Sequence, residues 1–482
     1  FTSTTSAVTP TESIATKAQT GVDRVYHFGS QGPRSVFSNH TSHSNRLIPF
    51  YTFGRKLDVA SVTGANSLYR DPEKIRALYG FLPEHTVNPT AVYADQSDFA
   101  RVQRDAVARG VKYLFIVWFD GLDWDTTRAA AIARTGKVYD EGKGAGLNFQ
   151  DETAEGSARF GFFVTSPTHE ENELDVDAQT VKIPSTAAGG GYDPRLGGET
   201  PWSPPARHAP GYLKGQSGNK EDKAGVLAAG GVVHAYTDSA PSAAEFVSGV
   251  KSYNNSINVA EDGRFVRTVL HDVQDKGWKV GSVTSVPISH ASPSGMYARN
   301  VSRNDFQDLT RDLLGLRSIA VETGKASQLP GLDVVMGTGF GQESTLEKLV
   351  KSQGKNAKAG NVFLTADDRA SIEARQGGRY VVVETATGVP GARALKEAAD
   401  QAARDGKRLF GFFGTSKLDH LPYRTADGHH DPAPGISGKA EEYSPALLRE
   451  QPTLADMTEA ALTVLAAQPG QPFALFVEAG DV

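Results

Sequence analysis

Several features are missing from this sequence of 482 residues, beginning with cysteine, of which there is none. Disulfide bonds, thiolate metal sites and cysteine nucleophiles are therefore excluded. No apolar run approaches the ~20 residues that a membrane-spanning helix needs. A strong excess of charge is missing too, because 50 basic and 56 acidic residues are interspersed and leave a formal charge of −6. We therefore expect neither a nucleic acid nor a membrane surface as a partner.

The residues that are present have the proportions of a soluble globular protein with a sizeable core. Hydrophobic residues make up 39% and charged residues 22% of the chain. The chain begins with Phe1 and continues with sequence rich in Ser and Thr. This start predicts a mature chain from which a secretion signal has been removed, hence a secreted or periplasmic protein. An artificial boundary is the alternative interpretation.

The composition divides the chain into a tail and one domain. Residues 1–20 predict a flexible tail, and residues 21–482 a single domain without internal repeats. Within this domain, residues 21–110 form an N-terminal decoration with scattered aromatic residues. Residues 186–223 are rich in Gly and Pro and predict a long surface insertion.

Strand-like and helix-like segments alternate along the rest of the chain. This alternation predicts an α/β fold, a three-layer αβα sandwich with a mostly parallel central sheet. The run KYLFIVWF is nearly continuous in apolar residues, which is typical of a central strand buried on both faces. The expected strands are Lys112–Phe119, Lys279–Val286, Leu332–Met336, Arg379–Val383, Leu409–Phe413 and Phe473–Val477, with a turn at Ser289–Ser294. The expected helices are Asp98–Arg109, Thr126–Arg134, Arg264–Lys276, Thr345–Ser352, Ala392–Asp405 and Leu454–Ala466.

The most informative stretch is GVVHAYTDSAPSAAEFVSGV, residues 231–250. Its first part predicts a short buried strand, and Ala-rich sequence with Pro241 near its start predicts a helix that begins at Asp238-Ser239. The unpaired N–H groups of a helix start favour an anion and would help to deprotonate the Ser239 hydroxyl. Simple capping of the helix by Asp238 or Ser239 is the plainer interpretation.

Oxygen-bearing side chains follow several of the predicted strands. Asp120, Asp238-Ser239, His290-Ala291-Ser292 and Glu478 each stand at a predicted strand end. In open α/β folds the carboxyl ends of the strands form the ligand-binding edge. Carboxylates gathered there without cations would repel one another, so this pattern predicts bound metal.

The motifs at these strand ends resemble those of alkaline phosphatases. The matching pieces are FDGLDWDTTRAA, YTDSAPSAAEFVSGVKSYNNSI, GSVTSVPISHASPSGMYARNVSR, LDVVMGTGF and FALFVEAGDV, which together span most of Lys112 to the C-terminus. The TDSA block followed by the HASP…SR block is the specific part of the resemblance. Residues 1–110 carry none of it.

The resemblance implies a role for each matching residue. Ser239 would be the nucleophile that takes the phosphoryl group, and Arg303 the guanidinium that grips phosphate oxygens. Asp120 would bridge Mg²⁺ and one of two Zn²⁺ ions, and the zinc ions would assist both displacement steps. Ser239 would also contact metal, Glu478 and Ser292 would complete the protein ligands of Mg²⁺, His290 would lie near Mg²⁺, and Asp238 would orient Arg303.

The resemblance also implies ligands that this sequence does not contain. The family places an Asp five residues after this Glu, with further Asp and His ligands beyond it. Counted from Glu478, that Asp would fall one residue past Val482. We therefore hypothesise that the C-terminal part of the fold, with most of the zinc ligands, is missing from this sequence.

Other residues allow competing interpretations. His429-His430-Asp431 resembles a replacement metal site, but its Gly- and Pro-rich surroundings favour a surface loop. Asp123 and Asp125 fit helix capping better than metal binding. Asp481 would replace the missing Asp only if the chain bulged there, and Asp419-His420 predicts an exposed turn.

The sequence therefore predicts a phosphomonoester hydrolase that acts on small-molecule phosphate esters, with a homodimer as a possible assembly. A phosphodiesterase of the same superfamily is the enzyme alternative. A non-catalytic exported protein that binds phosphate or metal is the other one. A sulfatase is disfavoured because no cysteine is present to become an aldehyde nucleophile, although a serine-derived version stays open.

Overall fold

The computed structural model describes residues 47–83, 86–122, 124–139, 142–169, 172–185, 189–191, 237–424 and 443–480. The predicted tail, nearly all of the predicted insertion and the strand expected before Thr237 lie outside these residues. His429-His430-Asp431, Asp123 and Asp481 also lie outside them, as does the side chain of Asp125.

Contacts between Cα atoms divide the chain into two compact units. The first unit comprises residues 1–109, 121–173 and 182–254, and the second comprises residues 110–120, 174–181 and 255–482. The predicted division into a tail, a decorated catalytic domain and an insertion stays a prediction.

A fully parallel six-stranded sheet forms the second unit. Its order is β11-β12-β8-β7-β13-β3, and every neighbouring pair is parallel. The strands are β3 (Tyr113–Phe119), β7 (Lys279–Pro287), β8 (Val334–Thr338), β11 (Tyr380–Glu384), β12 (Arg408–Phe412) and β13 (Phe473–Ala479).

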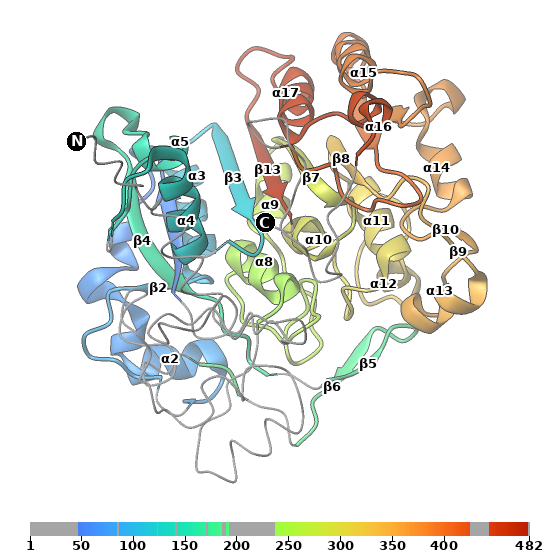
Figure 1. Ribbon diagram of the computed structural model, residues 1–482. Helices are drawn as coiled ribbons and strands as arrows, with labels where there is room; N and C mark the ends of the chain where they lie inside the picture. The colour runs from blue at the N-terminus through green and yellow to red at the C-terminus, as the bar shows by residue number, and fades with distance from the viewer. Residues whose placement is uncertain are drawn as a thin grey trace, which may run out of the picture. The chain divides into compact units, whose positions relative to one another are not determined.

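Helices cover both faces of this sheet, which confirms the predicted three-layer fold. On one face, α15 (Gly391–Asp405) and α17 (Leu454–Leu465) form a core with alternate strand residues such as Val283 and Leu475. On the opposite face, the Tyr380 hydroxyl donates to Leu332 O at 2.6 Å and reaches Leu314 at the end of α11 (Phe306–Leu314). Figure 1 shows α15 and α17 together, away from α9 (Val269–Gln274) and α10 (Ala291–Tyr297).

Short elements complete the second unit, and a smaller sheet organises the first. The short elements are α12 (Ile319–Glu322), α13 (Leu346–Gln353), α14 (Ala366–Ile372), α16 (Pro445–Glu450), β9 (Glu343–Ser344) and β10 (Gly360–Asn361). In the first unit, β4 (Arg159–Val164) lies between antiparallel β1 (Leu47–Thr52) and parallel β2 (Ala94–Asp95). The α-helices described in this unit are α2 (Pro72–Tyr79), α3 (Asp98–Ala108), α4 (Trp124–Thr135), α5 (Asn148–Asp151) and α8 (Ser239–Ser248). A hairpin of β5 (Glu173–Asp175) and β6 (Thr180–Lys182) spans the boundary between the two sets of residues.

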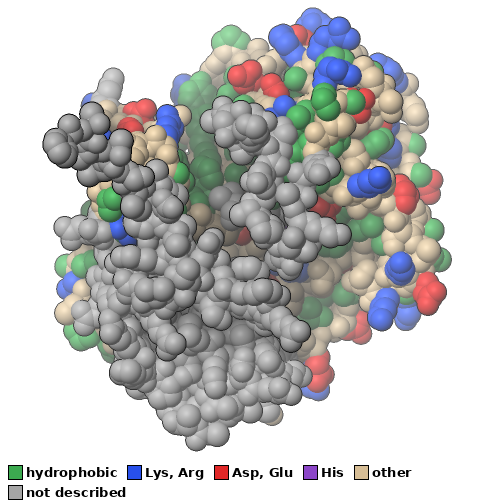
Figure 2. Space-filling view, in the orientation of Figure 1, with side chains coloured by type: hydrophobic (Ala, Val, Ile, Leu, Met, Phe, Trp, Pro, Cys, Tyr) green, Lys and Arg blue, Asp and Glu red, His purple; other side chains and the backbone are tan. Residues whose placement is uncertain are grey.

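The prediction that Lys112–Phe119 forms a central strand buried on both faces is wrong. Among the strands that the structure describes, β3 lies at the edge of the sheet, and of its side chains only Leu114 and Ile116 are buried, on the face of α9 and α10. On the other face, Phe115 is 50% and Val117 59% exposed, and hydrophobic side chains are visible over β3 in Figure 2. α17 packs mainly on β7, β8 and β13.

Two further expectations near β7 are corrected. The helix expected over Arg264–Lys276 is restricted to α9, because residues 258–266 pair with one another: Val266 N donates to Asn258 O at 2.9 Å. Thr268 then caps α9, with its amide donating to His271 Nδ1 at 3.1 Å. The turn expected at Ser289–Ser294 is the beginning of α10, where Pro293 falls in the first turn and needs no N–H partner. The other predicted helices and strands within the described residues agree to within two residues.

The edge position of β3 can be tested with the same substitution at two sites of the sheet. Val283→Ala in β7, where the side chain is fully buried, should lower the free energy of unfolding by about 2 kcal/mol. Val117→Ala in β3 should lower it by less than about 0.5 kcal/mol, because most of that side chain already contacts water. Urea denaturation measures both values, and equal losses would contradict the edge assignment.

Candidate active site

Ser239 is the first residue of α8, as the sequence predicts. Asp238 has extended backbone angles, and its Oδ1 accepts from Ala240 N at 2.8 Å, so it caps the helix. Asp238 and Ser239 are half-buried, whereas the following residues from Ala240 to Glu245 are buried. The capping interpretation of Asp238 is thus confirmed, and it leaves the Ser239 hydroxyl at the positive end of the helix.

A buried ionic cluster fixes α8 within the first unit. Lys251 Nζ lies 3.0 Å from Asp95 Oδ2 and 2.9 Å from Glu245 Oε2, and all three side chains are at most 1% exposed. Glu245 belongs to α8, and its Oε1 also accepts from Ser252 N at 2.8 Å. Tyr69 donates to Asp95 Oδ2 at 2.6 Å. The helix that carries Ser239 is therefore tied to β2 and to the segment that follows it by charge-assisted hydrogen bonds.

Burial shifts the acidities of this cluster. It raises the pKa of Glu245 to about 7, against the opposing effect of Lys251. Burial also opposes the charge on Lys251, but Asp95 and Glu245 outweigh it and raise the pKa of that ammonium. On the neighbouring helix α3, burial and the charge of Asp95 raise the pKa of Asp98 to about 7. This cluster was not predicted from the sequence, where its signal is that Glu245 and Lys251 are the only charged residues of the otherwise apolar and small-residue run 240–251.

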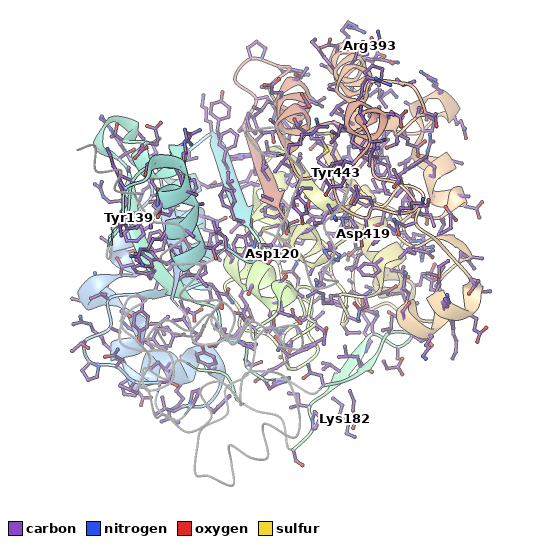
Figure 3. All side chains as sticks on the ribbon, viewed as in Figure 1. Asp120, Tyr139, Lys182, Arg393, Asp419 and Tyr443 are labelled. Carbon is purple, nitrogen blue, oxygen red and sulfur yellow. The ribbon has the colours of Figure 1, made fainter. Side chains whose placement is uncertain are left out.

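In the second unit, the carboxyl edge of the sheet brings three predicted site residues together. Asp120 directly follows β3 (Figure 3). Its amide donates to Ala479 O at 3.0 Å. Ser292, in the first turn of α10, has its Oγ 3.5 Å from Asp120 Oδ2. Glu478 is paired in register with Trp118 and Thr284, and its Oε2 accepts from Thr284 Oγ1 at 2.5 Å. Glu478 is 1% exposed, so this carboxylate lies deep in the edge.

Two further predicted site residues, His290 and Arg303, flank α10 in the sequence. His290 is the N-cap of α10, and its ring stacks on Phe306 with centroids 6.1 Å apart. Arg303 lies in a turn between α10 and α11, half-buried, with its amide donating to Asn255 O at 2.8 Å. Asp238 and Ser239 belong to the first unit, and Asp120, His290, Ser292, Arg303 and Glu478 to the second. The roles assigned to all seven stay predictions.

The oxygen atoms at this edge of the sheet suit Mg²⁺ better than Zn²⁺. Asp120, Ser292 and Glu478 offer two carboxylates and a hydroxyl, the hard donors that Mg²⁺ takes together with several waters. Among the residues that the structure describes, no group of three or more His, Cys, Asp or Glu side chains is placed to hold a metal. The residues at this edge therefore fit a magnesium ion in part and do not form a zinc site by themselves.

Comparison with known proteins identifies the family. The family model described as alkaline phosphatase matches residues 222–482. The chain belongs to the alkaline phosphatase family. The matched segment contains six of the predicted site residues, and Asp120 lies outside it, joined to it by the pairing of β3 with β13.

Individual alkaline phosphatases match over shorter stretches. Alkaline phosphatase 4 of Bacillus subtilis is 35% identical over 78 residues, 16% of this chain and 17% of that protein. The enzyme of Gadus morhua is 29% identical over 155 residues, 28% of this chain and 32% of that protein. The chain thus matches a sixth to a third of the length of these relatives. A solved structure of Thermus thermophilus alkaline phosphatase aligns at 18% identity over 76% of this chain and 49% of that one, with a TM-score of 0.37.

The helices add one negative finding. Within the ranges that the structure describes, none is both long and apolar enough to cross a membrane.

The raised pKa of Asp98 predicts how stability depends on pH. The pKa of Asp98 is about 7 in the folded state and about 4 in the unfolded chain. Its protonation therefore makes its full contribution to the free energy of unfolding below about pH 4. That contribution is lost as the pH rises through about 7, by up to ~1.4 kcal/mol per pH unit. Asp98→Asn keeps an acceptor for Asp95 N and removes the titration.

Urea denaturation from about pH 5 to pH 8 should therefore show Asp98→Asn gaining stability over the wild type as the pH rises. Asp105→Asn is the control on the same helix, where the side chain is 46% exposed and faces Arg101. A difference between Asp98→Asn and the wild type that does not change with pH would contradict the assignment.

Proposed function

We propose that this protein is a metal-dependent phosphomonoesterase that uses Ser239 as its nucleophile. The observation that carries the proposal is the family match over residues 222–482, which includes Ser239, Ser292, Arg303 and Glu478. The capped start of α8 supports the nucleophile, and the approach of Ser292 to Asp120 supports a site at the carboxyl edge of the sheet.

The proposed reaction has two displacements at phosphorus. In the first, Ser239 Oγ loses its proton and attacks the phosphorus atom, and the ester oxygen leaves as an alcohol after taking up a proton. In the second, a water oxygen attacks the phosphorus of the phosphoserine, the Oγ–P bond breaks, a proton from the water restores the serine hydroxyl, and inorganic phosphate is released. Each displacement is in line, so positioning and charge stabilisation carry most of the catalysis.

Two parts of the chain would stabilise the transferring group. The first-turn N–H groups of the ten-residue helix α8 favour the anionic phosphate beside Ser239. The planar guanidinium of Arg303 matches two equatorial oxygens of the phosphoryl group better than a lysine would. Asp238 would orient that guanidinium in addition to capping α8.

Magnesium would be held by Asp120, Ser292 and Glu478, and Thr284 would keep the Glu478 carboxylate oriented through its hydroxyl. When bound, such a cation supplies positive charge that offsets the gathered carboxylates and orders water near the phosphate. We also propose that two zinc ions bind, as in the family. Export to the periplasm or medium and a homodimeric assembly complete the proposal.

Ser239→Ala tests the nucleophile directly. Hydrolysis of p-nitrophenyl phosphate should fall by roughly 10⁴-fold or more, because the group that forms the covalent intermediate is gone. Binding of inorganic phosphate, measured by calorimetry, should persist. Ser248→Ala, at the other end of α8, is the control and should keep the wild-type rate. An active Ser239→Ala variant would overturn the proposal, and an inactive wild type that binds phosphate would favour the non-catalytic alternative.

Glu478→Gln tests the magnesium assignment. The variant keeps an acceptor for Thr284 but loses the charge, so the Mg²⁺ concentration for half-saturation should rise at least about tenfold. Calorimetric titration of the metal-stripped protein with Mg²⁺ gives this value independently of activity. Glu459→Gln, exposed on α17, is the control. Unchanged affinity in Glu478→Gln would contradict the role of this carboxylate.

A further inference from the structure

The turn of the β5–β6 hairpin places a buried glutamine against the loop that carries Arg303. Gln179 is 1% exposed and has a positive φ of 50°, which is unusual for a residue with a side chain. Its Nε2 donates to Val176 O at 2.8 Å, so the carboxamide is fixed within its own turn. The side chain therefore presents a donor and an acceptor to its neighbours in a defined orientation.

Both ends of this carboxamide bind residues just before Arg303. Gln179 Nε2 donates to Asn300 Oδ1 at 3.1 Å, and Val301 N donates to Gln179 Oε1 at 3.3 Å. The pair of contacts joins one side chain to a main-chain amide and to the side chain of the preceding residue. Such two-point recognition restricts rotation of the loop as well as its distance from the hairpin.

Asn300 continues the connection to the far side of Arg303. Its Oδ1 also accepts from Ser302 N at 3.0 Å, and its Nδ2 donates to Asp305 Oδ2 at 2.7 Å. Asn300 and Asp305 are each 1% exposed. Residues on both sides of Arg303 in the sequence are thus joined by hydrogen bonds through Asn300. Gln179 connects this hydrogen-bonded loop to the turn of the β5–β6 hairpin.

The hairpin turn has a second anchor that does not involve Gln179. Asp177 Oδ1 accepts from Lys355 N at 2.7 Å, just beyond the end of α13. The turn is therefore held to other parts of the second unit at two places. Replacement of Gln179 alone leaves the Asp177 contact in place, so the hairpin should keep its location.

We propose that Gln179 is a positioning residue that sets the orientation of Arg303 toward a phosphate group. The inference rests on the proposed function, because it takes Arg303 as the phosphate-binding guanidinium. Bidentate recognition requires the planar fork to be held within a fraction of an ångström of its productive place. A buried, uncharged carboxamide supplies that restraint without adding charge near an anion site.

Gln179→Met tests this proposal, since methionine fills a similar volume and offers neither the donor nor the acceptor. In the full-length protein with zinc and magnesium in the buffer, the inhibition constant of inorganic phosphate should rise roughly ten- to hundredfold, with a fall in kcat. Gln451→Met is the matched control: Gln451 is also buried, and its Oε1 accepts from Gly414 N at 2.8 Å. It should lower thermal stability to a similar extent and leave phosphate inhibition unchanged.

A double-mutant cycle separates positioning from general loosening of the fold. In an Arg303→Ala background, Gln179→Met should weaken phosphate inhibition no further, because the group it positions is absent. Equal effects with and without Arg303, or equal effects of Gln179→Met and Gln451→Met, would overturn the proposal. If Gln179→Met does not fold, Gln179→Asn replaces it, since Asn tolerates a positive φ while its shorter side chain withdraws the carboxamide.

Assays of the wild-type protein separate a failure of the Gln179 proposal from a failure of the proposed function. Wild-type protein that hydrolyses phosphate esters, together with a Gln179→Met variant that behaves like the control, refutes the positioning role alone. Wild-type protein that neither hydrolyses the ester nor binds phosphate refutes the proposed function, and the inference falls with it.

Discussion

The parallel pairing of β13 between β7 and β3 is the constraint on which the candidate metal site depends. This register sets Glu478 opposite Thr284 on one side and Trp118 on the other, and the amide of Asp120 continues the pairing to Ala479. Two carboxylates that are far apart in sequence thereby reach the same edge of one sheet. A shift of one residue in β13 would turn Glu478 to the opposite face, toward the layer of α15 and α17.

In the first unit, the main constraint is on the position of helix α8, which begins at Ser239. α8 is capped by Asp238 at one end, and Glu245 ties its other half to Lys251 and Asp95 in a buried cluster. A buried cation between two carboxylates stabilises less than its close contacts imply, because each charge loses its hydration. The cluster restricts the positions of its three side chains more than it stabilises the fold, because the removal of any one partner leaves a buried charge uncompensated. We interpret the cluster as a fixed base for the helix that presents Ser239.

Local patterns in the sequence predicted most of the large sheet. The runs Val334–Met336 and Phe473–Val477 are wholly apolar, and the start of α8 follows from the Asp-Ser-Ala-Pro sequence. The order of the strands could not be predicted in this way. KYLFIVWF is as apolar as a central strand, yet β3 lies at the edge of the sheet that the structure describes, because composition does not specify which strands have helices over them.

The contacts that surround Arg303 show a second limit of sequence reasoning. Gln179 and Asn300 are ordinary polar residues in turn-like sequence, and nothing in their local pattern marks them as buried partners. Such pairs depend on the fold that brings a hairpin turn against a distant loop. The Lys251 cluster is similar, since Asp95 and Glu245 are recognisable only once β2 and α8 are packed together.

Trapping of the covalent intermediate is the measurement that tests the central claim most directly. The protein is mixed with a phosphate ester, quenched in acid within the first turnovers, digested and analysed by mass spectrometry. The account predicts one phosphorylated peptide, with the phosphoryl group on Ser239. Rapid turnover without any phosphoserine, or with the phosphoryl group on another residue, would contradict it.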